Sequence, residues 1–274
     1  MIKIGIRAHD FGKRKPLDMA LKVKSFGLDG IQLVINKALL LEDNLSKDLL
    51  KEVALTFNKH QIDIALLGAY FNPIHSNPDK RENNLRHFEN TLVNAKLFNC
   101  NYVGTETGSY HDDKWIYHPD NHKEGAYQTV LTTFKKLESF RIKNQISTKI
   151  AIEGAFNHVI YNPKVMKRLL DELNSDDIRV IVDLYNFLNI NNHEEHITIF
   201  KECINLFGPK IKIIHLKDYL VQDNQLVQVP VGKGLMDYNE IMKLIKQLPQ
   251  DVYLIFEGTK ETHLQESLKY ITSR

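Results

Sequence analysis

The stretch KIAIEGAFNHVIYNPKVMKRLLDELNSDDIRVIVD at residues 149–183 decides the fold. It opens with a short apolar run that ends at Glu153, continues through a segment of helical character at residues 163–174, and closes with a second apolar run that ends at Asp183. Nearly unbroken apolar runs are typical of parallel strands buried on both faces, and two parallel strands need a crossover such as a helix between them. The stretch therefore predicts one strand–helix–strand unit.

The same alternation extends along the whole chain. The expected strands are short runs rich in Ile and Val, at residues 2–6, 30–34, 63–67, 102–105, 149–152, 179–182, 212–214 and 252–256. Helical segments follow them at residues 16–26, 45–60, 80–99, 123–143, 163–174, 194–207, 238–248 and 261–273. This pattern predicts an α/β fold, a (β/α)8 barrel that occupies residues 1–274 as a single domain. A doubly wound open sheet is the alternative, but no G-x-G-x-x-G turn follows the first expected strand.

The composition is ordinary for a soluble globular protein, with 43% hydrophobic and 26% charged residues. The 36 Lys and Arg residues nearly balance the 34 Asp and Glu residues, which argues against a protein whose main task is to bind nucleic acid. Cys100 and Cys203 lie far apart in the chain, and we expect both to be reduced thiols. Because we find neither a secretory signal nor a long apolar run, we expect a cytoplasmic protein that does not enter a membrane.

The last four expected strands each end at a side chain that can bind a metal ion, and the active site of such a barrel lies at these strand ends. The four side chains are Glu153, Asp183, His215 and Glu257. Any one of them could be a capping or turn residue, but three carboxylates brought together in a partly desolvated site would repel one another without a cation. Three carboxylates and one imidazole favour Mn²⁺, with Mg²⁺, Co²⁺ or Zn²⁺ as alternatives. The sequence therefore predicts a divalent metal site.

The residues around these strand ends resemble those of the xylose isomerase-like TIM-barrel superfamily of sugar (phosphate) isomerases and epimerases. The matching segments are 152–153, 182–183, 214–218, 231–234, 237–238 and 256–258, and segment 27–33 also fits except that Gln32 stands where the family often has Glu. The resemblance implies that Glu153, Asp183, His215 and Glu257 hold the metal. It also implies that Glu153 and Glu257 exchange protons with a small carbohydrate through a cis-enediolate. A homodimer or homotetramer is a further expectation from the family.

Six residues are candidates for substrate binding. Asn186 stands where the family often has a His, and Lys217 is the nearest basic residue where some epimerases have an Arg. The other four candidates are Glu106 and Tyr70 at strand ends, Trp115 in the long loop at residues 108–122, and His9 after the first strand. An ordinary loop role remains open for these four. We expect His75 to lie at the surface.

Three other functions remain open. A metal-dependent dehydratase of a keto-polyol such as an inosose would share the enolate step and differ only in the loss of a hydroxyl group. An apurinic-site endonuclease is disfavoured because several histidines of that group are absent, for example at Asn186 and around Tyr70. A non-catalytic barrel that binds a ligand is the third. The loop Gly232-Lys233-Gly234 resembles a turn that binds phosphate, so phosphorylation of the substrate stays undecided.

Overall fold

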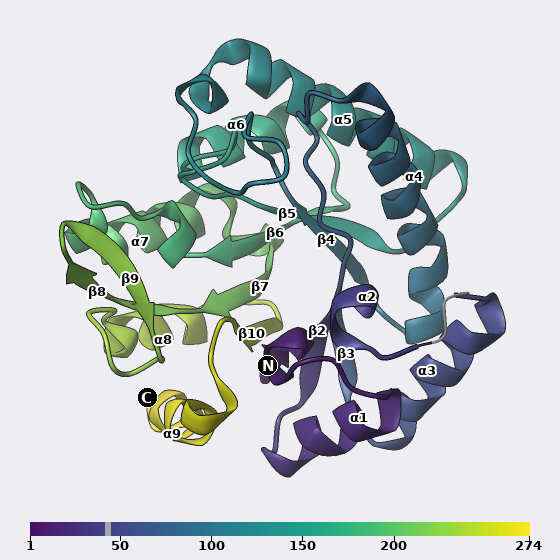
Figure 1. The fold of residues 1–274 in the computed structure, drawn as a ribbon. Coiled ribbons are helices and arrows are strands. Elements are labelled where there is room, and N and C mark those ends of the chain that lie inside the picture. The colour runs from purple at the N-terminus through teal and green to yellow at the C-terminus, as the bar shows by residue number, and fades with distance from the viewer. Residues whose placement is uncertain (42–44) are drawn as a thin grey trace.

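The computed structural model describes residues 1–41 and 45–274, which form a closed barrel of parallel strands surrounded by helices (Figure 1). Around the barrel the strand order is β1-β10-β7-β6-β5-β4-β3-β2, and the register pairs Ile2 with Val252 and Ile6 with Phe256 where the first and last strands meet. This confirms the prediction of a (β/α)8 barrel. The strands are β1 (Ile2–Arg7), β2 (Gly30–Leu33), β3 (Asp63–Gly68), β4 (Tyr102–Glu106), β5 (Lys149–Glu153), β6 (Ile178–Asp183), β7 (Ile211–Leu216) and β10 (Val252–Phe256).

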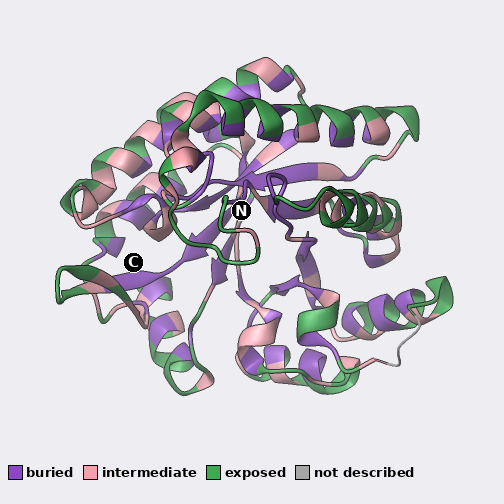
Figure 2. Ribbon diagram, turned by 45° about the horizontal axis from the view of Figure 1, so that its top comes forward, coloured by how far each residue is buried: buried purple, intermediate pink, exposed green. Residues whose placement is uncertain are grey.

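The helices bury one face against the barrel and leave the other exposed, as Figure 2 shows. Their starts follow from local chemistry. Side-chain oxygens of Ser46, Asn77 and Asn162 accept backbone N–H bonds in the first turns of α3, α4 and α6. The helices are α1 (Pro16–Ser25), α2 (Ile35–Ala38), α3 (Lys47–Lys59), α4 (Pro78–Asn94), α5 (Glu124–Lys143), α6 (Pro163–Leu173), α7 (His196–Phe207), α8 (Tyr238–Lys246) and α9 (Glu261–Thr272).

The expected and observed helix bounds differ most at residues 80–99. The α-helix α4 stops at Asn94, and a 3-10 turn (Ala95–Phe98) completes the segment. That turn ends at Asn99, whose φ of 51° is in the left-handed region, where Asn is among the better tolerated residues. None of the helices in residues 1–41 and 45–274 is long and apolar enough to cross a membrane.

A layer of apolar side chains fills the middle of the barrel. It consists of Ala65, Leu66, Ala151, Ile181, Ile213 and Ile255. The space is tight, because a Cβ on Gly104 would come within 2.8 Å of Ile181 and 3.0 Å of Leu66. Side chains alternate between the two faces of a strand, so the residue two places after Ala151, Ile181, Ile213 or Ile255 also points into the barrel, one layer higher. This alternation turns the last residues of the strands inward.

A β-hairpin after β7 was not among the expected elements. It consists of β8 (Asp218–Gln222) and β9 (Gln225–Val229), which pair antiparallel as a separate two-stranded sheet. Asp223 and Asn224 form the turn with φ values of 47° and 58°, as a two-residue hairpin turn requires. The hairpin lies beside β7 at the edge of the barrel (Figure 1).

Candidate metal centre and substrate pocket

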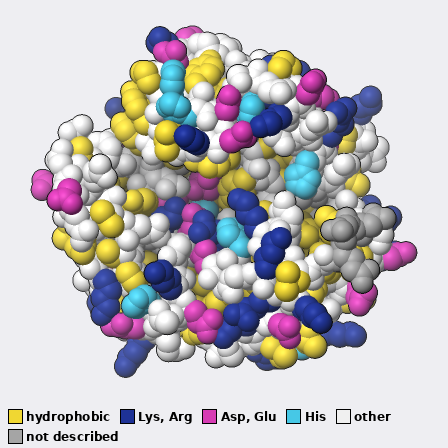
Figure 3. Space-filling view, viewed as in Figure 1, with side chains coloured by type: hydrophobic (Ala, Val, Ile, Leu, Met, Phe, Trp, Pro, Cys, Tyr) yellow, Lys and Arg dark blue, Asp and Glu magenta, His cyan; other side chains and the backbone are white. Residues whose placement is uncertain are grey.

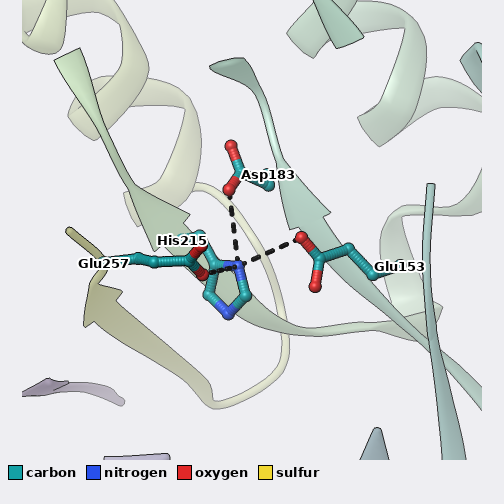
Figure 4. Close-up of side chains that lie close together, drawn as sticks. All are labelled: Glu153, Asp183, His215 and Glu257. Atoms are coloured by element: carbon teal, nitrogen blue, oxygen red, sulfur yellow. Dashed lines mark ion pairs between the residues drawn. The ribbon is translucent and has the colours of Figure 1, made fainter. Parts of the chain in front are cut away.

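The structure brings together the four side chains that the sequence predicted as metal ligands (Figure 4). Glu153 follows Ala151, Asp183 follows Ile181, His215 follows Ile213 and Glu257 follows Ile255, each two residues along from the apolar layer. Nδ1 of His215 lies 3.0 Å from a carboxylate oxygen of Glu257, 3.4 Å from one of Glu153 and 3.5 Å from one of Asp183. One ligand atom from each residue lies within 4.8 Å of the others. Ligands held at 2.0–2.2 Å from one ion would be at most about 4.4 Å apart, so a small adjustment closes the set.

One buried nitrogen of this cluster makes no hydrogen bond in the described structure. Nδ1 of His215 faces the three carboxylates, whereas Oδ2 of Asp183, which also lacks a hydrogen bond of good geometry, is paired with Nζ of Lys217 at 2.7 Å. The other ring nitrogen of His215 lies 2.7 Å from Oε1 of Gln32. If that nitrogen donates its proton to Gln32, the lone pair on Nδ1 points at the three carboxylates. Buried polar atoms are rarely left without a partner, so the donor set fits a divalent cation.

Two cations already face the cluster from the protein itself. Nζ of Lys217 lies 2.7 Å from Oδ2 of Asp183 and 2.8 Å from Oε1 of Glu257. The guanidinium of Arg7 lies 2.8 Å from the same oxygen of Glu257. Three carboxylates against these two cations leave one negative charge when His215 is neutral. A dication would reverse the sign of that charge.

The charges of this cluster shift the pKa values of Glu257 and His215. Burial alone would raise the pKa of Glu257, but Lys217 and His215 outweigh it and hold that pKa well below the ordinary value. Burial would likewise lower the pKa of His215, but Glu153 and Glu257 hold it well above. A proton on His215 would therefore supply part of the positive charge that a metal ion would bring to this cluster.

Three of the six candidates for substrate binding touch the metal cluster. Nδ2 of Asn186 donates to Oε1 of Glu153 at 2.9 Å, and the Tyr70 hydroxyl lies 3.4 Å from the other oxygen of Glu153. Lys217, the third, also donates to Oδ1 of Asn186 at 3.2 Å. Asn186 and Tyr70 thus hold Glu153 through neutral donors, whereas the cations Lys217 and Arg7 hold Glu257.

Glu106 and Trp115 line a pocket of about 510 Å³ that opens from the metal cluster. Glu257 and Lys217 form its floor on the side of the cluster. Figure 3 shows acidic, basic and histidine side chains gathered in the hollow at the centre of this face. His9, the sixth candidate, is half-buried but is not among the residues that line the pocket. Burial, with a smaller effect of the Arg7 charge, lowers its pKa to about 4.

The structure corrects one expectation and adds one residue to the pocket. His75 is only 5% exposed, not at the surface, because the long loop folds back so that Asp113 lies 3.3 Å from its ring. His158 is buried in the pocket wall, with Nε2 3.7 Å from Glu106 and its ring 5.3 Å from that of Trp115. Its position five residues after Glu153 was the only sequence signal for this role.

A larger cavity, of about 700 Å³, lies at the opposite end of the barrel. It is lined by residues near the N-terminal ends of the strands, such as Lys3, Asp63 and Tyr253. None of the four metal-cluster residues lines it. Because barrel enzymes keep their catalytic groups at the C-terminal ends of the strands, the smaller pocket is the candidate substrate site.

Comparison with known proteins agrees with this architecture. The family described as xylose isomerase-like TIM barrel matches residues 20–274, whereas no curated protein matches the chain. One similar structure is the 3-keto-D-glucoside 4-epimerase YcjR from E. coli, with 16% identity, a TM-score of 0.76 and full coverage of both chains. A second is the probable 3-DHS dehydratase AsbF from Bacillus anthracis, also with 16% identity, a TM-score of 0.76 and full coverage of both chains.

A third similar structure is the IolI protein with a bound zinc atom, with 16% identity, a TM-score of 0.75, and coverage of 99% of this chain and 95% of that chain. At these identities the three structures establish the shared fold and no more. The match of the family over residues 20–274 goes further, because it covers nearly the whole sequence. This chain belongs to the xylose isomerase-like TIM-barrel family.

Proposed function

We propose that the protein is a metal-dependent isomerase or epimerase of a small sugar or ketose, acting through a cis-enediolate. The observation that carries the proposal is the convergence of three carboxylates and one imidazole at the C-terminal mouth of the barrel, with Nδ1 of His215 left without a hydrogen bond in the described structure. The family match and the similarity in fold to an epimerase support it.

Glu153, Asp183, His215 and Glu257 would hold the metal. The carboxylate-rich set favours Mn²⁺, and Mg²⁺, Co²⁺ or Zn²⁺ are alternatives. A divalent ion there would supply Lewis acidity that stabilises the negative charge of an enediolate. The zinc atom bound in the IolI structure, which has the same fold, supports metal binding by this chain.

Glu153 and Glu257 are the proposed acid/base pair. They stand at the ends of β5 and just past β10, on different sides of the mouth, so a substrate between them is approached from two directions. One carboxylate would remove the proton next to the substrate carbonyl, and the other would return a proton. Lys217 and Arg7 keep Glu257 ionised and fix one of its oxygens, while Asn186 and Tyr70 orient Glu153.

A dehydratase of a keto-polyol is the second candidate, and Glu106 favours it. Burial and the charges of Glu153 and Glu257 raise the pKa of Glu106 well above its ordinary value. A carboxyl group whose pKa is raised keeps its proton to a higher pH and can give that proton to a departing hydroxyl group. Similarity in fold to the AsbF dehydratase supports this alternative.

The experiment is a panel of ketoses and keto-polyols incubated with Mn²⁺ and the protein in deuterium oxide. Incorporation of deuterium next to the carbonyl, measured by mass spectrometry, reports proton abstraction whatever the final product is. We expect incorporation with at least one compound, its loss after treatment with a chelator, and its return on addition of Mn²⁺ or Co²⁺. Exchange that persists in the metal-free protein would contradict the proposed mechanism, and loss of water from the compound would identify the dehydratase.

A further inference from the structure

We infer that the substrate pocket takes an uncharged, hydroxyl-rich molecule and discriminates against its phosphate ester. This inference rests on the proposed function and specifies the substrate class of the same site. Three features of the structure carry it: the charges of the pocket lining, and two backbone sites near the mouth that internal carboxylates occupy.

Apart from the proposed metal ion, the described pocket lining offers no free cation to a phosphate. Lys217 is the one Lys or Arg among the described lining residues, and its ammonium group already lies between Asp183 and Glu257. Glu106 and Glu257 add acidic groups to the wall. His158 adds no positive charge at neutral pH, because burial, together with the charge of Lys217, lowers its pKa to about 4.

The remaining wall suits a sugar. Asn157, Asn189 and Gln225 bring amide groups, which both donate and accept hydrogen bonds as hydroxyl groups do. Trp115, Phe156 and Tyr185 bring aromatic faces. Ligand pockets commonly combine apolar walls with a few polar groups that fix the orientation of the ligand, and 510 Å³ lies in their usual range.

The first occupied backbone site is the loop after the hairpin. Barrels of this kind often bind phosphate with the loops after the seventh and eighth strands, where backbone N–H groups converge. Here the N–H groups of Gly232 and Gly234 donate to Oδ2 of Asp218 at 2.9 and 3.0 Å. Those of Tyr219 and Met236 donate to its Oδ1 at 2.9 and 3.0 Å.

A phosphate therefore finds this loop already filled. Asp218 is 1% exposed, and a Cβ on Gly234 would collide with its carboxylate, so the loop is closely fitted around the aspartate. Lys233, the cation that made the Gly-Lys-Gly sequence resemble a phosphate turn, pairs instead with Glu266 on the exposed side. The resemblance of this loop to a phosphate site is explained by its binding of an internal carboxylate.

The second occupied backbone site follows β10. The N–H of Gly258 donates to Oδ2 of Asp10 at 2.7 Å. Arg7, a cation that could have bound a phosphate there, donates twice to Oδ1 of Asp10, at 3.0 and 2.7 Å, and once to Glu257 at 2.8 Å. In both loops that would hold a phosphate, the hydrogen-bond donors are thus already bound to Asp218 or Asp10.

Matched pairs of ligands test the inference. D-fructose, D-tagatose, D-xylulose and D-ribulose would each be compared with the same sugar carrying a terminal phosphate, at constant Mn²⁺. Trp115 is the only Trp of the chain and lines the pocket, so its fluorescence reports binding there without any turnover. We expect the free sugar of any pair that binds to have a dissociation constant at least tenfold lower than its phosphate.

The outcomes separate the inference from the proposed function. A phosphate ester that binds as tightly as the free sugar, or more tightly, overturns the inference and leaves the isomerase proposal intact. If no carbohydrate binds and none exchanges deuterium, the proposed function fails, and the inference fails with it.

A pair of substitutions on the hairpin tests whether the charge of the pocket lining causes the discrimination against phosphate. Gln225 lines the pocket, whereas its partner in the ladder, Gln222, is exposed and is not among the lining residues. Gln225→Arg should lower the dissociation constant of the phosphate ester at least threefold relative to that of the free sugar. Gln222→Arg, the matched control, should change neither. No gain with Gln225→Arg, or an equal gain with Gln222→Arg, would contradict the argument from the charge of the pocket.

Discussion

The two ends of the barrel differ in how their charged side chains are balanced. At the N-terminal end, Nζ of Lys3 lies 2.6 Å from Oδ2 of Asp63, and the Tyr253 hydroxyl donates to the same oxygen at 2.5 Å. At the C-terminal mouth, three carboxylates gather around His215, and Lys217 and Arg7 are the two cations that face them. The first arrangement is balanced, and the second needs a further cation.

Strand β10 contains both arrangements. Every second residue of this strand points into the barrel. Tyr253 lies at the N-terminal end, Ile255 lies in the apolar layer, and Glu257, just after the strand, lies in the metal cluster. The fold therefore does not by itself distinguish the ends, since the same strand contributes to both. What distinguishes them is the balance of charge. The first end has one ion pair, and the second has three carboxylates against two cations, which indicates stabilisation at one end and chemistry at the other.

The largest expected effect comes from replacing one carboxylate by its amide, at the mouth or, in a matched variant, at the N-terminal end. Glu257→Gln keeps the side-chain volume but removes a proposed base, so the rate of deuterium incorporation should fall about 10³-fold, within the range of general acid–base catalysis. Asp63→Asn, the matched change at the N-terminal end, should leave the rate within threefold. Circular dichroism would check that both variants fold. A Glu257→Gln variant with the activity of the wild type would remove Glu257 from the mechanism.

The second effect is on stability. If the mouth lacks a cation, Mn²⁺ at about 100 times its dissociation constant should stabilise the protein by about 2.7 kcal/mol, seen as a higher melting temperature. The Asp183→Asn variant, which loses one ligand, should lose most of that rise, whereas Asp63→Asn should keep it. A rise that is equal in the two variants would place the metal elsewhere.

The third effect concerns pH and the pocket wall. The pKa of His158 is lowered to about 4 by burial and by Lys217, whereas in the unfolded chain it is near 6.5. Between pH 6.5 and 4 the unfolded chain binds a proton that the folded chain does not, so the free energy of unfolding falls as the pH falls through this range. The loss is up to about 3 kcal/mol from this residue.

Urea unfolding at pH 7, 6, 5 and 4 measures this loss in the free energy of unfolding. The His158→Gln variant should lose less stability over this range than the wild type, and the part that remains includes that of His9. An unchanged slope in the variant would show that His158 is protonated as easily in the folded chain as in the unfolded one.

The smallest effect is expected from Tyr253→Phe, which removes one hydrogen bond to Asp63 at the N-terminal end. Asp63 is partly exposed, so water can replace the lost donor, and we expect a cost of about 1 kcal/mol in the free energy of unfolding. Catalysis and the response to Mn²⁺ should be unchanged. A loss of activity in this variant would mean that the two ends are coupled.

The barrel and its four-residue cluster were predictable because both depend on local patterns. Apolar runs identify the strands, and the period of two along a strand fixes which side chains point inward, so Glu153 and Glu257 could be placed at the mouth from sequence alone. Their roles as ligands and bases remain predictions.

The features that were missed depend on segments that are distant in the sequence. His75 is buried by Asp112 and Asp113 of the long loop, and Asp218 is held by N–H groups up to 18 residues away. No local period indicates such contacts. The hairpin is different, because its turn is local: Asp223 and Asn224 are residue types that tolerate the positive φ values that a two-residue turn needs.

The hairpin also makes substrate preference and metal binding separable in evolution. Its two strands form a sheet of their own in which Asp218 is opposite Val229, so the chain leaves and re-enters the body of the protein at one place. Its tip, Asn224 and Gln225, contributes to the pocket, yet neither strand pairs with the barrel. Residues at this tip can therefore be randomised, or the hairpin exchanged between relatives, to change what the pocket accepts while the strand register that aligns the four candidate ligands stays the same.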